Sequence, residues 1–353
     1  MEIFFKGFLF LKNYSYYRYY SHYIYDSHYS YYPHYPPFFT MIIGLGETVY
    51  DIIFKDGQPL RAVPGGSTFN AMISLGRSGA DCLMMTETGD DHVGDIITHF
   101  LKENGVNTDY VYRHKGTKSH VSLAFLNARN DAEYQFYKDH AALQLPDRMP
   151  LIKQGDIVLF GSYFAINPVL RDYVGRFLRT AKEQGATLYY DINFRASHKG
   201  EIPQLLASLE DNMRLATVVR GSLEDFSILY GITTGEEAYT RVQGLCDTMI
   251  YTDAANPVQV FTPHGKQTFP VPQVKTVSTI GAGDNFNAGF CYALHNIEAS
   301  TKTLIWQHIP QLVSSGIAFS SEVCQSLDNY VGGKGEKLRI KSSELRKGCE
   351  LTV

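Results

Sequence analysis

Short apolar runs alternate with amphipathic patterns over most of the chain. The apolar runs predict β-strands at residues 41–45, 82–85, 157–160, 187–190, 217–219, 248–251 and 271–277. The patterns between them predict helices at residues 67–77, 93–103, 169–182, 203–215, 283–294 and 303–320, the first capped by Ser67 or Thr68. This alternation is typical of parallel strands joined by crossover helices on both faces of a sheet. We therefore expect an α/β fold with a doubly wound, mainly parallel sheet.

Residues 48–63 and 119–137 depart from this alternation, because both show only strand-like patterns. The second stretch is divided by a turn signal at Ala128, Asn130 and Asp131. We expect the two stretches to form a small antiparallel β lid inserted into the α/β domain. An ordinary edge hairpin would show the same local pattern.

Residues 1–40 differ from the rest of the chain, because eleven of them are tyrosine and six are phenylalanine. They show neither strand alternation nor a helical stripe. A signal peptide is a poor interpretation, since Lys6 and Lys12 interrupt the apolar stretch and no small-residue cleavage site follows. We interpret the segment as sequence upstream of a true start at Met41, or as a disordered extension. One domain is then expected over residues 41–332, with a C-terminal tail at 333–353.

Composition excludes several functional classes. With 44% hydrophobic residues in 353, the chain can bury a large core. Its net charge of −4 gives no basic field that would attract nucleic acid or an anionic membrane, and it has no run of 18 apolar residues. The five cysteines are widely spaced, which favours a reducing compartment over a disulfide framework. We expect a cytoplasmic protein.

The strongest chemical signal is the segment STIGAGD at residues 278–284, which opens a predicted helix. Gly281 and Gly283 leave the backbone unshielded, so several N–H groups can converge at the positive end of the helix dipole and bind an anion. Asp284 falls in the first helical turn, at the mouth of that site. A glycine-rich turn with an acidic cap would have the same sequence.

Four further clusters combine glycine with polar side chains, and each alone is more often structural than functional. They are Gly44-Leu45-Gly46-Glu47 with Asp51, Pro64-Gly65-Gly66 leading to Asn70, Gly89-Asp90-Asp91 leading to Gly94, and Asp191-Ile192-Asn193-Phe194-Arg195. In the last, alternation would place the three polar groups on one side, facing a polyhydroxylated ligand. The chain has no P-loop, so an anion site needs another positive charge, most simply Mg²⁺ carried by a nucleotide.

In this order, the five clusters resemble the pfkB family of carbohydrate kinases, which has the ribokinase-like fold. The resemblance spans about residues 41–330, and residues 137–142 with Asp191-x-Asn193-x-Arg195 look most like the fructokinase branch. It implies an ATP-dependent sugar phosphotransferase with a β lid over the sugar, through which two copies could form a homodimer. ATP, Mg²⁺ and a small sugar are the implied ligands.

The resemblance also implies roles for individual residues. Asp284 would be the catalytic base, and the N–H groups of Gly281, Ala282 and Gly283 would stabilise the transferring phosphoryl group. The sugar would be bound by Asp51, Gly65, Gly66, Asn70, Asp191, Asn193 and Arg195. The nucleotide would be bound by Ser222, Asp225, Thr279, Gly281 and Gly283, with Asp225 reaching the metal through water.

Two departures from the family pattern bear on the ions. Where the family often has Asp-Thr-Thr, this chain has Ser278-Thr279-Ile280, so activation by K⁺ is in doubt. The family's Asn-x-x-Glu motif is replaced by Ser222-Leu223-Glu224-Asp225, which keeps a carboxylate and loses the amide.

The substrate remains open at this point. Fructose is the leading expectation, and 2-keto-3-deoxygluconate is the alternative because Arg195 could bind a carboxylate. Nucleosides are less favoured, since no aromatic pair can be assigned to a base. A pseudokinase that binds ligands without turnover is a third alternative, against which the intact Asp284 argues.

Overall fold

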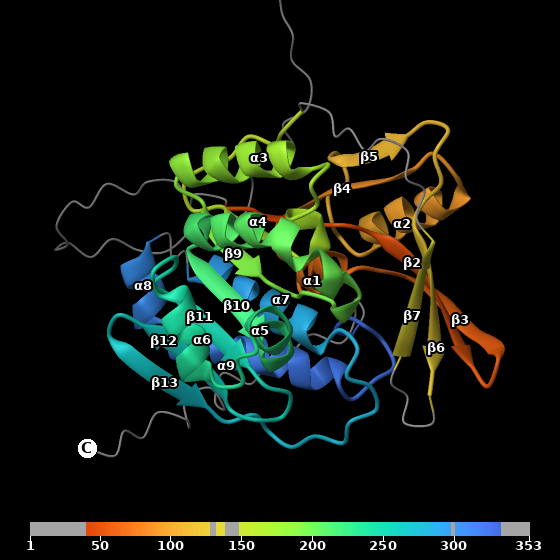
Figure 1. The fold of residues 1–353 in the computed structure, drawn as a ribbon. Helices are drawn as coiled ribbons and strands as arrows, with labels where there is room; N and C mark the ends of the chain where they lie inside the picture. The colour runs from red at the N-terminus through yellow and green to blue at the C-terminus, as the bar shows by residue number, and fades with distance from the viewer. Residues whose placement is uncertain (1–39, 128–131, 138–147, 298–300, 333–353) are drawn as a thin grey trace, which may run out of the picture. The chain divides into compact units, whose positions relative to one another are not determined.

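The computed structural model describes residues 40–127, 132–137, 148–297 and 301–332 (Figure 1). The predicted extension up to residue 39, the turn signal at 128–131 and the C-terminal tail at 333–353 lie outside the described residues.

A nine-stranded sheet forms the centre of the domain, in the order β13-β12-β11-β10-β9-β8-β1-β4-β5. All neighbours from β5 to β11 are parallel, and only β12 and β13 add antiparallel pairs at one edge. The strands are β1 (Ile42–Leu45), β4 (Cys82–Gly89), β5 (Val111–His114), β8 (Ile157–Gly161), β9 (Thr187–Asp191), β10 (Val218–Ser222), β11 (Met249–Thr252), β12 (Val258–Thr262) and β13 (Gly265–Phe269). The predicted doubly wound sheet is confirmed.

Helices cover both faces of this sheet (Figure 1). One buried cluster lies under α1 (Ser67–Arg77), α2 (His92–Glu103), α7 (Ala282–Asn296), α8 (Lys302–Gln307) and α9 (Ile309–Val323). The other lies under α3 (Arg171–Glu183), α4 (Ile202–Leu215), α5 (Leu223–Tyr230) and α6 (Gly235–Val242). Short 3₁₀ turns, η1 (Tyr163–Ala165) and η2 (Ala196–Glu201), follow β8 and β9. The central strands are therefore buried on both faces, which explains their continuous apolar runs.

The two stretches with only strand-like patterns form a separate four-stranded sheet, which we call the lid. Its order is β3-β2-β6-β7, from β2 (Val49–Lys55), β3 (Gln58–Gly65), β6 (Val121–Leu126) and β7 (Ala132–Tyr137). The outer pairs are antiparallel hairpins, but the central pair, β2 with β6, is parallel. The lid exists as predicted, although it is mixed rather than purely antiparallel.

Two other predicted elements are wrong for reasons that involve proline. Residues 271–277 form no strand, because Pro270 and Pro272 lack the N–H groups that would continue the ladder of β13. The long helix predicted at residues 303–320 is divided at His308 into α8 and α9, with Pro310 in the first turn of α9. Proline is tolerated in the first turn of a helix. In the interior of one continuous helix it would remove a backbone hydrogen bond.

In the part of the chain that the structure describes, no helix has both the length and the apolar character needed to cross a membrane.

Candidate active site

Asp284 lies where the first turns of α1 and α7 meet. Its side chain is buried, and one carboxylate oxygen accepts a hydrogen bond from the Ser67 hydroxyl at 2.6 Å. The other oxygen accepts from the Asn70 side-chain amide at 2.8 Å. Two donors from α1 thus fix the orientation of a carboxylate on α7, which is the geometry that a general base needs.

The predicted cap of α1 is wrong. Gly66 occupies the N-cap position with φ of 123°, and no side chain caps the helix. The Ser67 hydroxyl bonds to Asp284 instead. A Cβ at Gly66 would lie 2.5 Å from the carbonyl oxygen of Glu47, so this turn requires glycine for both its φ and its close approach.

The pKa of Asp284 is raised, because burial disfavours the charged form more than the hydrogen bonds from Ser67 and Asn70 favour it. A raised pKa makes the carboxylate a stronger proton acceptor. The side-chain oxygen of Asn70 is also buried, and it has no hydrogen-bond partner among the described residues. A buried acceptor without a partner is costly, so a ligand hydroxyl that donated to Asn70 would stabilise the site.

The turn from Gly281 to Gly283 leaves two N–H groups open beside Asp284. Gly281 has φ of 78° and is the N-cap of α7, with no side-chain cap. The N–H of Ala282 donates to the carbonyl oxygen of Thr279 at 3.2 Å. The N–H groups of Gly281 and Gly283 have no such bond to the described residues. Of the three N–H groups predicted to bind an anion, those of Gly281 and Gly283 are thus open, and Thr279 is exposed on the same turn.

Asp51 lies on β2 at the base of the lid and is buried. It accepts a hydrogen bond from the Ser122 hydroxyl across the parallel β2–β6 pair. Burial raises the pKa of Asp51 to about 6, with the bond from Ser122 opposing the rise and the charge of Glu47 adding to it. A Cβ at Gly65 would lie 2.4 Å from an oxygen of Asp51, so glycine at 65 leaves the space that this carboxylate occupies.

The face of the lid that carries Asp51 also carries an aromatic pair that sequence reasoning missed. Cross-strand register places Ser122 opposite Phe136 and Ala124 opposite Tyr134, on the same face as Asp51. The rings of Tyr134 and Phe136 stack at 5.9 Å between centroids. The pKa of Tyr134 is raised to about 12, mainly by burial and then by the charge of Asp51, with a smaller contribution from Asp284. The spacing of Tyr134 and Phe136 by two residues predicts that both side chains lie on one face of a strand. Only the strand register shows that this is the face of Asp51.

The three polar groups of the Asp191–Arg195 segment do not share one side. Strand β9 ends at Asp191, and Asn193 has φ of 37°, so strand alternation does not continue. Both Asp191 oxygens are engaged, one by Arg220 and the other by Asn287. Asn193 donates to the Ser162 hydroxyl at 2.7 Å.

Arg195 is exposed. Its positive charge partly offsets the rise in the pKa values of Tyr134 and Asp284. Of the three, Asp191 and Arg195 both act on Asp284 through their charges, Asp191 raising its pKa and Arg195 lowering it.

Arg220 is a second group that sequence reasoning missed. It lies on β10, is buried, and donates to Asp191 at 2.9 Å and to the Thr252 hydroxyl at 2.7 Å. The predicted strand at residues 217–219 stopped one residue short of it. A charged residue that continues an apolar strand was the available signal, because a buried guanidinium needs a partner.

Ser222 and Asp225 form a capping box at the start of α5. One Asp225 oxygen accepts from the N–H and hydroxyl of Ser222, both at 2.7 Å, and the other from the N–H of Phe194 at 2.6 Å. No group of three His, Cys, Asp or Glu side chains that could hold a metal occurs among the described residues.

The Gly89–Gly94 cluster is structural. Asp91 caps α2 by accepting from the N–H of Gly94 at 2.9 Å, and it also binds the N–H and hydroxyl of Ser119. Arg113 donates to the carbonyl oxygens of Gly89 and Asp91. The Asp91 carboxylate and the carbonyl oxygens of Gly89 and Asp91 are thus occupied by Gly94, Ser119 and Arg113.

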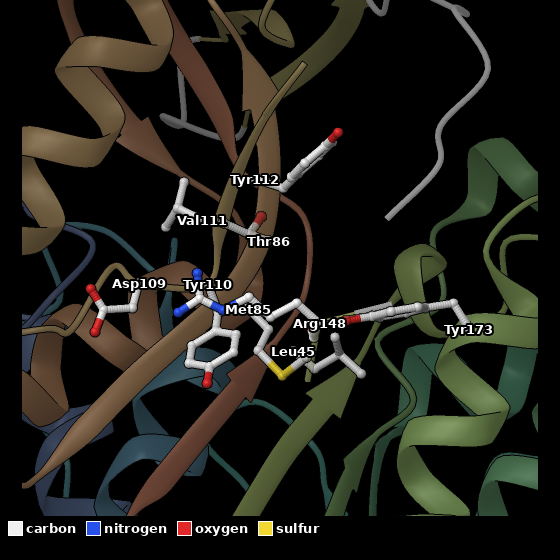
Figure 2. A pocket seen from close by; sticks show the side chains of 9 residues that line it. All are labelled: Leu45, Met85, Thr86, Asp109, Tyr110, Val111, Tyr112, Arg148 and Tyr173. Carbon is white, nitrogen blue, oxygen red and sulfur yellow. Dashed lines mark hydrogen bonds between the residues drawn. The ribbon is translucent and has the colours of Figure 1, made fainter. Parts of the chain in front are cut away.

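A cavity of about 280 Å³ lies between α3 and the edge of the sheet formed by β1, β4 and β5 (Figure 2). Leu45 and Met85 contribute apolar surface to it, and the guanidinium of Arg148 lies over the ring of Tyr110 at 5.1 Å. No predicted site residue lines this cavity. It is therefore distinct from the group formed by Asp51, Asn70 and Asp284.

Comparison with known proteins agrees with this geometry. The family model "pfkB family carbohydrate kinase" matches residues 40–328. The aminoimidazole riboside kinase of Salmonella typhimurium is 26% identical over 271 residues, which cover 75% of this chain and 82% of that protein. The probable fructokinase-4 of Arabidopsis thaliana is 27% identical over 258 residues, which cover 70% and 78%.

Among solved structures, the fructokinase of Vibrio cholerae O395 with fructose, ADP and calcium ion bound has a TM-score of 0.72 at 22% identity. The match covers 82% of this chain and 94% of that one. It shows that the fold is ribokinase-like. Because the family model spans nearly all of the described domain, the chain belongs to the pfkB family of carbohydrate kinases, which transfer a phosphoryl group to an alcohol acceptor.

Proposed function

We propose that the chain uses ATP to phosphorylate a hydroxyl group of a small sugar, with fructose as the preferred substrate. The observation that carries the proposal is the placement of Asp284, held by Ser67 and Asn70 beside the open N–H groups at the start of α7. Asp284 would accept the proton of the attacking hydroxyl. The N–H groups of Gly281 and Gly283 would stabilise the phosphoryl group in transfer.

The sugar would lie between the base of the lid and the starts of α1 and α7. Asp51 and the side-chain oxygen of Asn70 would accept hydrogen bonds from sugar hydroxyls, beside the backbone of Gly65 and Gly66. Buried acceptors reject an analogue that lacks the hydroxyl more strongly than pocket size does. We therefore expect deoxy sugars to be poor substrates.

The nucleotide would lie on the other side of Asp284. Thr279 and the N–H groups of Gly281 and Gly283 would face its phosphates, and Mg²⁺ bound to those phosphates would neutralise their charge. Ser222 and Asp225 would contribute indirectly, by holding the start of α5 in place, because their hydrogen bonds already form its capping box. Ser278 in place of a carboxylate argues against activation by K⁺.

Two observations favour other substrates. The stacked pair of Tyr134 and Phe136 on the Asp51 face of the lid could hold the ring of a riboside, and a relative of this chain is named a riboside kinase. Exposed Arg195 forms no ion pair with the described residues and could bind the carboxylate of an acidic sugar such as 2-keto-3-deoxygluconate.

A coupled assay for ADP release would test the proposal, with fructose, 2-keto-3-deoxygluconate, ribose, tagatose phosphate, adenosine and aminoimidazole riboside as acceptors. We expect the highest kcat/KM with fructose. A higher value for the acidic sugar or for a riboside would overturn the substrate. Calorimetric binding of sugar and ATP with no turnover on any acceptor would identify a pseudokinase.

The proposal includes a homodimer formed through the lid. Phe125 and Tyr137 are 40% and 56% exposed, and both lie on the lid face opposite Asp51. An exposed aromatic face of a small sheet favours association. Sedimentation would report a monomer in F125S if this face joins two copies. We place the reaction in the cytoplasm, where ATP is available; the four cysteines in the described part of the chain are free thiols.

A further inference from the structure

Arg220 is a buried cation next to the anion-binding turn. Its guanidinium donates to Asp191 and to Thr252, and its Nε has no partner among the described residues. A Cβ placed on Gly283 would lie 3.0 Å from each of the two terminal nitrogens of Arg220. The guanidinium therefore lies against the backbone of Gly283, in the turn whose N–H groups are open.

The charges around this turn are mostly negative without Arg220. Asp191, Asp225 and Asp284 are all buried nearby. Apart from burial, the charge of Asp191 raises the pKa of Asp225 and that of Asp284. Burial disfavours the charge on Arg220, but the attraction of Asp191 and Asp225 outweighs it and raises the pKa of Arg220. The guanidinium is thus always charged, and it offsets carboxylates that would otherwise repel a triphosphate.

Arg220 also explains why position 283 is glycine. Gly283 has no unusual φ in the structure, so backbone strain does not require glycine there. A side chain at this position would instead displace the guanidinium. The two residues act as one unit: the small residue allows the cation to approach the turn.

We propose that Arg220 is a positioning residue for phosphoryl transfer: it supports the backbone of Gly283 and keeps the potential at the open N–H groups positive. It acts through the turn and through Asp191 rather than by contact with the reacting atoms. This inference rests on the proposed kinase function. It adds a source of positive charge that the sequence patterns did not reveal.

Arg220→Met tests the inference through two separate readouts. With the best acceptor of the wild type, kcat should fall about 10²-fold, the range for loss of one preorganised stabilising group, while the Kd of the sugar changes less than about 3-fold. Binding of magnesium tripolyphosphate, measured by calorimetry, should weaken at least about 10-fold. Because this second readout needs no turnover, it tests Arg220 even if the wild type phosphorylates no acceptor, which would refute only the proposed function.

Three further variants separate electrostatics from stability. Arg220→Lys should have a higher kcat than Arg220→Met, because lysine keeps the positive charge, and a lower kcat than the wild type, because it lacks the planar set of donors of a guanidinium. Arg171→Met removes an ion pair with Asp211 on α4 and should lower Tm without changing kcat or tripolyphosphate binding. The double variant Asp191→Asn with Arg220→Met removes both charges of the Asp191–Arg220 pair, so no buried charge is left without a partner. It tests the inference if Arg220→Met alone does not fold. Wild-type kcat and wild-type tripolyphosphate binding in a folded variant without Arg220 would overturn the inference.

Discussion

Two glycine-rich turns in this protein each lead into a helix and each carry an aspartate, yet they differ in what they leave open. At the start of α2, Asp91 caps the helix and Arg113 binds the carbonyl oxygens of the turn. At the start of α7, no side chain caps the helix, and Asp284 turns towards α1. At α2 the carboxylate itself closes the helix end and binds Ser119, which is a structural use. At α7 open N–H groups lie beside a carboxylate that α1 holds in place, and such an arrangement can bind a ligand.

The two aspartates also differ in their ionisation. Burial is the largest influence on each pKa, but hydrogen bonds from Ser119 and Gly94 outweigh it for Asp91, so that pKa is lowered. For Asp284 burial dominates, and the pKa is raised. Ionised Asp91 stabilises the fold, while ionised Asp284 costs stability.

The largest expected effect separates the two aspartates. Asp284→Asn should lower kcat about 10²- to 10⁴-fold, because Asp284 is the general base of the proposed mechanism. Asp91→Asn should leave kcat within about 3-fold and lower the free energy of unfolding by about 1 kcal/mol. Steady-state kinetics and urea unfolding of both variants would check this. Near wild-type turnover in Asp284→Asn would remove Asp284 from the mechanism.

The next effect falls on the structural turn alone. A Cβ at Gly94 would lie 2.2 Å from the carbonyl oxygen of Gly89, so Gly94→Ala should force the turn apart. We expect a loss of about 1–3 kcal/mol, the usual range for overpacking. Gly244→Ala is the matched control, because a Cβ there would meet open space and its φ is not in the left-handed region. Thermal unfolding that placed Gly94→Ala at the wild-type Tm would contradict the close contact.

A pH dependence follows from Asp51. Its pKa rises from 3.8 to about 6 on folding, so the folded state binds more protons between these values, and stability falls as pH rises from about 4 to 6. Asp51→Asn should therefore raise the free energy of unfolding by about 1–2 kcal/mol at pH 8 and by almost nothing at pH 4. Part of the effect is offset because the Ser122 hydroxyl donates a weaker hydrogen bond to an amide oxygen than to a carboxylate. Urea unfolding at both values of pH would measure the gain, while the KM for the sugar should rise. A gain that did not grow with pH would refute the raised pKa.

The smallest expected effect concerns Arg195. If the substrate is fructose, Arg195→Met removes at most a hydrogen bond, and KM should rise about 5-fold, or about 1 kcal/mol. If the substrate is an acidic sugar, the loss should be about 2–4 kcal/mol. Comparing KM for fructose and for 2-keto-3-deoxygluconate in this variant would distinguish them. A collapse on the acidic sugar, together with higher wild-type activity on it, would replace fructose as the substrate.

Sequence alone predicted the elements whose patterns are local. The apolar runs of the parallel core and the amphipathic helices α1, α2 and α4 lie close to where the sequence placed them. The hairpin of β12 and β13 and the short helices α5 and α6 were missed, since each is brief and has little periodicity of its own. The predicted strand at 271–277 was wrong because the prediction followed the apolar pattern and gave too little weight to Pro270 and Pro272.

The candidate site was predictable in its residue types and not in its contacts. Asp284, Asn70 and Asp51 were chosen as neighbours of glycine turns, and the structure brings Asp284 and Asn70 into contact. Their roles in binding and catalysis stay predictions. Asp191 was expected to face a ligand, but an Arg220 that lies 29 positions away occupies it. Pairings between distant strands decide such contacts, and no spacing along the chain records them.

The parallel pairing of β2 with β6 has a consequence for folding kinetics. Residues 56–120 lie between the two strands, so closing this loop costs chain entropy that no local turn can reduce. The contact of Asp51 with Ser122 should therefore form late, after the central strands have docked. In hydrogen exchange, the amides of the β2–β6 pair should open more readily than those of β8. The proposed sugar-binding contact at Asp51 would then be among the last parts of the domain to form.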